Sequence, residues 1–196
     1  MLKLVLIATA SLAAAGVVAL GVARLVRTVE TPDYVVSVAD EDFELREYPA
    51  MVVASVDRDG DRQGAVRRAF SPLAGYIFAK DRPGEKIAMT APVTQRPSQP
   101  GWTVSFIMPA GRSVEDLPVP GGDVRLSTVA SRVVAAVRFS GRWTDKRFEE
   151  QAARLREWVS ARGLEVVGDV EYAYYNDPFT PAFMRRNEIL IEVARS

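Results

Sequence analysis

The stretch Val52-Val53-Ala54-Ser55-Val56 decides the fold, because the chain repeats it 81 residues later as Val133-Val134-Ala135-Ala136-Val137. Leu45 recurs at the same spacing as Leu126. Both copies are rich in β-branched residues, which favour strands, and each copy with its upstream Leu is typical of two short strands or one bent strand. The sequence therefore predicts that the first element of the fold is duplicated.

A helix follows the repeated stretch in each half of the chain. The two helices share one apolar pattern at an offset of 82 residues: Val66, Phe70, Leu73, Tyr76 and Ile77 in the first, and Phe148, Ala152, Leu155, Trp158 and Val159 in the second. This spacing places each set on one helical face. Pro72 is expected to kink the first helix or to start a second short one. Thr144 is a typical N-cap of the second helix, and Gly163 is a typical terminator.

Two more strands complete each half. We expect Lys86–Thr90 to correspond to Glu171–Tyr175, and Trp102–Met108 to correspond to Glu188–Val193. Each half then has the order strand, helix, strand, strand, and two such halves can join their sheets. We predict an α+β fold in which duplicated βαββ units form a curved or barrel-like antiparallel sheet with two helices packed on it.

Composition excludes several classes of function. The 196 residues include 25 Lys and Arg and 25 Asp and Glu, but no His and no Cys. Balanced charge offers no basic field for a phosphate backbone, so we expect no nucleic-acid partner. Without His and Cys, the chain lacks the commonest general base, thiolate nucleophiles and the usual proximal haem ligands. No nucleophile motif or acid–base pair is recognisable, and we predict that the protein is not an enzyme and has no catalytic residues.

The N-terminal residues 1–33 form a separate segment. Leu4–Ala23 is a run of twenty uncharged, mostly apolar residues, which at about 1.5 Å per residue can cross a hydrocarbon core. The run predicts a retained signal anchor, while small residues such as Ala19 and Gly21 leave a cleaved signal peptide as the alternative. We expect the domain outside the cytoplasm, either anchored to the membrane or exported. The predicted division is an anchor or signal peptide plus linker over residues 1–33, and a folded domain over residues 34–196.

Five short motifs of the predicted domain resemble those of a known family. They are Phe43–Pro49, Lys86–Val93, Trp102–Pro109, Asn176–Pro181 and Arg185–Ile189. In this order and spacing, which spans roughly residues 38–196, they resemble the SOUL family of haem-binding proteins. The resemblance implies two βαββ units around a pseudo-twofold axis. It also implies a site for haem, a related tetrapyrrole or another hydrophobic small molecule.

The resemblance further implies where a ligand binds. In haem-binding members, the first helix and the residues near the C-terminal Arg-Arg-Asn turn line a shallow apolar surface, and basic side chains meet the propionates. Carried over to this chain, the surface contains Arg67, Phe70, Leu73 and Ala74. Arg185 is the candidate basic residue at the C-terminal turn.

The chain also departs from the family pattern. Some members carry Met and Lys where this chain has Ala74 and Gly75, and Pro181 stands where a Lys precedes the Arg-Arg turn. The axial His of some members has no counterpart. A haem site in this chain therefore has fewer positively charged residues, although Lys80, Arg82 or Arg185 could replace the missing positive charge.

Three groups of residues have both a binding and a structural interpretation. Met89, in the Met-Thr-Ala-Pro turn, is the methionine we favour as an axial haem ligand, but methionines in β-rich cores often only fill gaps. Tyr172 and Tyr174 share a strand face, where a phenolate could ligate iron or the rings could simply pack. Because adjacent residues of a strand face opposite sides, at most one of Arg185 and Arg186 points to any pocket.

The sequence thus predicts noncatalytic binding of haem or a related tetrapyrrole or hydrophobic ligand by a membrane-anchored or exported domain. The alternative is a membrane-associated interaction or scaffold domain that has lost ligand binding. The predicted ligand-binding residues are Arg67, Phe70, Leu73, Ala74, Met89 and Arg185.

Overall fold

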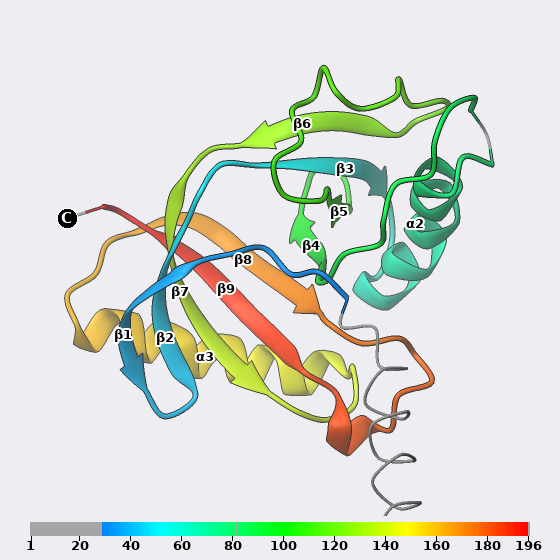
Figure 1. Ribbon diagram of the computed structural model, residues 1–196. Coiled ribbons are helices and arrows are strands. Elements are labelled where there is room, and N and C mark those ends of the chain that lie inside the picture. Colours follow the sequence, from blue (N-terminus) through cyan, green and yellow to red (C-terminus); the bar gives the residue numbers. More distant parts are fainter. Residues whose placement is uncertain (1–28, 81, 196) are drawn as a thin grey trace, which may run out of the picture.

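The computed structural model describes residues 29–80 and 82–195 of the chain. Its elements are β1 (Val35–Asp40), β2 (Phe43–Tyr48), β3 (Met51–Arg58), α2 (Arg62–Ile77), β4 (Val93–Pro97), β5 (Trp102–Ile107), β6 (Arg125–Val129), β7 (Arg132–Phe139), α3 (Asp145–Ala161), β8 (Val166–Tyr174), the 3-10 turn η1 (Ala182–Met184) and β9 (Asn187–Val193). The strands form one antiparallel sheet in the order β1-β2-β7-β9-β8-β4-β5-β3-β6 (Figure 1). The predicted α+β fold is confirmed, and the curved sheet stays open.

The sheet order is symmetrical about the contact between β8 and β4. On one side lie β8, β9, β7 and β2, and on the other lie β4, β5, β3 and β6. The first strand of each half crosses to the other half, since β2 pairs with β7 and β6 pairs with β3. The duplicated first element is therefore two short strands, and each βαββ unit is preceded by a strand that ties it to its copy.

The prediction of a strand at Lys86–Thr90 is wrong. Within this range only Thr90 makes a β-bridge, to Glu30, and the first strand after α2 is β4. The Ile87 amide donates instead to the Ile77 carbonyl at the end of α2, at 2.8 Å. The Ile87 side chain is buried in the core below that helix. The segment is thus held by the helix end, which its apolar residues alone could not reveal.

Both helices begin at a side-chain cap, and α3 ends at a glycine. The Asp61 side chain accepts the Gly64 amide at the start of α2, and that helix continues through Pro72, so the expected second short helix does not form. The predicted cap of α3 is confirmed, because the Thr144 hydroxyl accepts the Arg147 amide. Gly163 follows the helix at φ +64°, a left-handed conformation that suits a C-terminal glycine.

Each helix packs over its own half of the sheet and gives that half its own core (Figure 1). Phe148 and Leu155 of α3 pack on β7, β8 and β9, and Leu73 and Ile77 of α2 pack on β3 and β5. The other sheet face carries a smaller apolar cluster together with buried charged residues. Among the hollows of the described residues, one groove lies beside the helices and one cavity lies on the opposite face.

The end of the predicted linker lies against the domain. The Glu30 carbonyl accepts the Ala91 amide at 2.8 Å, and its carboxylate accepts the Ala110 amide at 2.7 Å. Leu4–Ala23 lies outside the described residues, so the signal anchor, its cleaved alternative and the domain boundary stay predictions. Among residues 29–80 and 82–195, no helix has both the length and the apolar character needed to span a membrane.

Candidate ligand-binding groove

A groove of about 870 Å³ opens between the first half of α2, the turn before α3 and the loop before β9. Its lining consists of Arg62, Gln63, Val66, Arg67, Phe70, Arg142, Trp143, Thr144, Tyr174, Pro178, Phe179, Thr180, Pro181, Ala182 and Arg185. Four of these side chains are arginines and none is acidic. The groove therefore combines aromatic and apolar walls with a positive rim.

The aromatic walls of the groove are unusually open to solvent. Phe70 is 46% exposed although its ring meets Phe106 edge-on at 5.6 Å, and Phe179 is 94% exposed at the tip of the loop before β9. Trp143 packs edge-on against Tyr174 at 5.4 Å and forms the base. Exposed aromatic side chains that face one hollow are typical of a binding surface for a flat apolar molecule.

Two of the four arginines of the groove bind other residues of the protein. Arg62 is buried, donates from Nε to Asp145 at 2.8 Å and lies over the Phe148 ring. Arg185 donates to the carbonyls of Thr180 and Pro178, at 2.8 and 2.7 Å. These contacts hold the start of α3 and the loop before β9 in place, and so they shape the groove.

The other two arginines of the groove, Arg67 and Arg142, are exposed to solvent. Neither makes a hydrogen bond or ion pair with any other residue that the structure describes. Arg67 comes from α2, and Arg142 comes from the turn before α3, so the two guanidinium groups approach the groove from different elements. They are available to bind anionic groups such as carboxylates.

Tyr174 is the residue in the groove whose oxygen could in principle ligate iron. Its hydroxyl donates to Gln95 Oε1 at 3.0 Å and accepts a hydrogen bond from Arg62. Burial raises the pKa of Tyr174 to about 12, in spite of the nearby Arg62 charge. The phenol is therefore protonated at neutral pH. The groove fits the apolar plate and the acidic groups of haem, but its lining offers no His, Cys, Met or phenolate as an axial ligand.

The structure brings three of the six predicted ligand-binding residues together, since Arg67, Phe70 and Arg185 line the groove. Leu73 and Ala74 lie on the buried side of α2, and Met89 is exposed on the loop before β4 without lining the groove. None of these positions is tested by a ligand, so the binding roles remain predictions.

Adjacent Arg185 and Arg186 take opposite sides, as strand alternation predicts. Arg185 lies 4.5 Å from the Trp143 ring at the groove, whereas Arg186 pairs with Glu188 at 2.7 Å on the other face of the sheet. Tyr175 also lies on that face, where its hydroxyl donates to Glu188, while Tyr172 and Tyr174 face the helices. The alternation of side chains along β8 and β9 is thus confirmed.

Sequence reasoning missed Arg142, Trp143 and Phe179 as groove residues. Trp143 has the position of a helix-start residue that packs on Phe148, and Phe179 belongs to the Asn176–Pro181 motif. Those signals mark both residues as structural without showing which hollow they face. Arg142 has no local signal at all, because only the tertiary fold brings its turn next to α2.

The comparisons with known proteins agree with this architecture. The family described as SOUL heme-binding protein matches residues 29–192, and the chain belongs to this family. It is 31% identical over 158 residues to heme-binding protein 2 of Mus musculus, covering 75% of this chain and 76% of the relative. It is also 29% identical over 180 residues to heme-binding protein 2 of Homo sapiens, covering 83% of this chain and 85% of that protein.

Solved structures with the same fold are more distant in sequence. The EcmrR C-terminal domain superimposes with a TM-score of 0.62 at 15% identity, covering 79% of this chain and 98% of that domain. A protein from Listeria innocua described as a hydrolase superimposes with a TM-score of 0.55 at 15% identity, covering 81% of this chain and 94% of its own. At this level of identity the likeness concerns the fold alone.

Proposed function

We propose that the groove binds haem or a related tetrapyrrole without catalysis, and that Leu4–Ala23 anchors the domain to a membrane or directs its export. One observation carries the binding proposal: exposed aromatic side chains and two unpaired arginines face the same groove, whose lining has no acidic residue. Membership of the SOUL heme-binding family supports the ligand class. The run of twenty uncharged residues supports the location.

The groove has the size and chemistry that such a ligand requires. Its volume of about 870 Å³ lies within the range of roughly 300–1,000 Å³ that is usual for small-molecule sites. Phe70 and Phe179 can cover the faces of a macrocycle, and burial of apolar area contributes about 25 cal/mol per Å². Arg67 and Arg142 can bind the propionates as charge-assisted hydrogen-bond donors. The affinity for haem then comes from burial of the macrocycle and from the contacts of its propionates, not from a bond to iron.

Arg67→Ala and Arg142→Ala are each expected to weaken haemin binding about tenfold, because each removes one charge-assisted contact. Absorbance titration of the full-length protein with haemin measures this. Arg156→Ala is the matched control, since Arg156 is an exposed arginine on α3 outside the groove. Equal affinity in all four proteins would place the ligand elsewhere.

Protoporphyrin without iron is expected to bind within about threefold of haemin, since the groove offers no axial ligand and a metal bond adds little. Quenching of tryptophan fluorescence, to which Trp143 in the groove contributes as one of three tryptophans, reports the binding of either ligand. A drop of more than about tenfold on removing iron contradicts the proposed mode and makes Met89→Ala the next variant to test.

The alternative, a membrane-associated scaffold that has lost ligand binding, makes opposite predictions. It requires that neither haemin nor protoporphyrin saturates the protein at one molecule per chain. The proposed location has a separate test, the mass of the mature protein. An intact Leu4–Ala23 indicates an anchor, and its loss indicates a cleaved signal peptide.

A further inference from the structure

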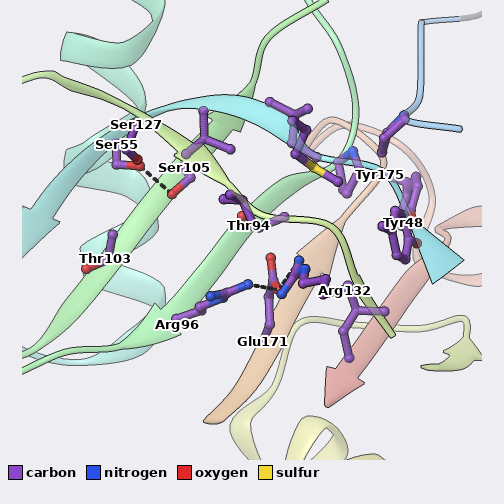
Figure 2. Close-up of a pocket in the computed structure, with 17 residues that line it drawn as sticks. Tyr48, Ser55, Thr94, Arg96, Thr103, Ser105, Ser127, Arg132, Glu171 and Tyr175 are labelled. Atoms are coloured by element: carbon purple, nitrogen blue, oxygen red, sulfur yellow. Dashed lines mark hydrogen bonds and ion pairs between the residues drawn. The ribbon is translucent and has the colours of Figure 1, made fainter. Parts of the chain in front are cut away.

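We propose that the sheet face opposite the helices holds a second ligand site, specific for a small carboxylate with an apolar body. The site is a cavity of about 170 Å³ between the two halves of the sheet. Figure 2 shows side chains from both halves converging on it, with Arg96, Glu171 and Arg132 at one end. It shares no lining residue with the groove and differs from it in size and chemistry.

Strand register divides the cavity into a polar and an apolar part. Thr94, Ser105 and Ser55 occupy one row across β4, β5 and β3, and the two serine hydroxyls lie 2.8 Å apart. The next row on the same face contains Ile107 and Val53, with Ser127 at its outer edge on β6. Farther along β3 and β6, Met51 and Val129 extend the apolar part. A molecule with one polar end and one apolar end matches this gradient.

The polar end presents guanidinium N–H donors, which favour an anion. Glu171 Oε2 accepts from Arg96 at 2.7 Å and from Arg132 at 2.8 Å, so one buried carboxylate is shared by two guanidinium groups. Burial alone raises the pKa of Glu171, but the two arginine charges outweigh that effect and hold the pKa below its usual value. Glu171 is therefore ionised at neutral pH, and it holds both guanidinium groups at this end of the cavity.

Glu192 also pairs with Arg132, so the two arginines and two glutamates of this cluster balance in charge. Glu192 Oε2 lies 3.7 Å from Arg132 Nη1 and does not line the cavity. Arg132 is only 9% exposed, and its Nε–H has no acceptor among the described residues. A buried donor without a partner is unfavourable unless an acceptor is supplied. Arg96, which is more exposed and bonds Glu171 through one nitrogen, has further N–H groups for the same anion.

The volume sets the size of the apolar body. An apolar cavity of about 150 Å³ can hold a benzene molecule, so a cavity of about 170 Å³ accepts one six-membered ring with a small head group. Haem does not fit it. The inference thus stands apart from the proposed function, and failure of either leaves the other in place.

A matched set of fluorinated probes tests the head group. 4-Fluorobenzoate, 4-fluorobenzamide and 4-fluorobenzylamine share one ring and differ in charge, and 19F NMR of the full-length protein in a nonionic detergent measures their binding. We expect 4-fluorobenzoate to bind about tenfold more tightly than the amide, the fold-change of one charge-assisted contact, and the amine to bind least. Tighter binding of the amine, or no binding of the benzoate at millimolar concentration, overturns the proposal.

Two variants place the benzoate in the cavity. Arg96→Gln removes the accessible guanidinium and is expected to weaken binding about tenfold. Ser127→Phe fills the cavity from the edge strand β6, where Ser127 is exposed and a bulky residue is tolerated, and is expected to abolish binding. Thr128→Phe, on the other face of the same strand, is the matched control and should bind normally. Loss of benzoate binding in Arg67→Ala but not in Ser127→Phe assigns the anion to the groove and overturns the second site.

Discussion

Replacing Glu188 by Ala is expected to lower the free energy of unfolding by about 3–5 kcal/mol, the usual cost of removing one partner of a buried ion pair. Glu188 is 0% exposed and Arg46 is 2% exposed, and they form two hydrogen bonds of 2.7 and 3.1 Å between β9 and β2. Without the carboxylate, the Arg46 charge stays buried with Glu44 as its one remaining ionic partner among the described residues and the Tyr48 hydroxyl as a neutral one. Urea unfolding of the full-length protein measures the change.

The control for Glu188→Ala is Glu150→Ala on α3, where the partner Lys146 is 4.0 Å away and both side chains are exposed. This change should cost less than about 0.5 kcal/mol. The double variant Arg46→Met/Glu188→Leu should be more stable than Glu188→Ala, because it leaves no unpaired charge from this pair. A loss below about 1 kcal/mol in Glu188→Ala would show that water reaches Arg46.

The same cluster gives stability a predictable pH dependence. Burial alone raises the pKa of Glu188, but Arg46 and Arg186 outweigh it and hold the pKa below its usual value of 4.5. A lowered pKa means that the folded state gives up this proton more readily than the unfolded chain. The stabilisation is therefore complete above about pH 4.5 and is lost as the pH falls towards the folded-state pKa. Glu188→Gln should flatten the acid side of the stability curve by up to about 1.4 kcal/mol per pH unit.

Much of the fold was predictable because apolar periodicity reports local structure. The repeated Val52–Val56 and Val133–Val137 stretches became β3 and β7, and the two apolar helix faces became α2 and α3. Lys86–Thr90 was misread as a strand because its backbone partners come from the end of α2 and from Glu30, which are tertiary contacts. The periodicity of apolar residues shows which side of a helix or strand is buried. It does not show which segments form backbone hydrogen bonds with one another.

The positions of site residues were predictable only where neighbours in the sequence determine which way a side chain points. Alternation of side chains at the entry to β9 correctly separated Arg185 from Arg186. The groove itself is assembled from three distant segments, so Arg142 could not be linked to Arg67 without the fold. The cavity on the other face is still less visible, because Arg96, Arg132 and Glu171 come from three strands and each alone has the sequence context of a solvated strand residue.

Leu73→Ala and Phe70→Ala are expected to have opposite phenotypes although both residues belong to the apolar face of α2. Leu73 is 0% exposed in the core between α2 and the sheet, so its truncation leaves a cavity and should cost about 2–5 kcal/mol. Phe70 lies at the edge of that face, where it keeps one contact with Phe106 and opens to the groove. Its truncation should cost less than about 1.5 kcal/mol and weaken haemin binding more than Leu73→Ala does.

Thermal unfolding and haemin titration of both variants separate the two roles, with Ala74→Gly as a small-residue control on the buried side of α2. The reason is geometric, because a helix on a curved sheet has a wide apolar arc and only the middle of that arc is covered. If Phe70→Ala were the more destabilising change and left haemin binding intact, Phe70 would be part of the core. Haemin would then have to bind at the Arg185 end of the groove, where the exposed Phe179 and Trp143 offer the remaining aromatic surface.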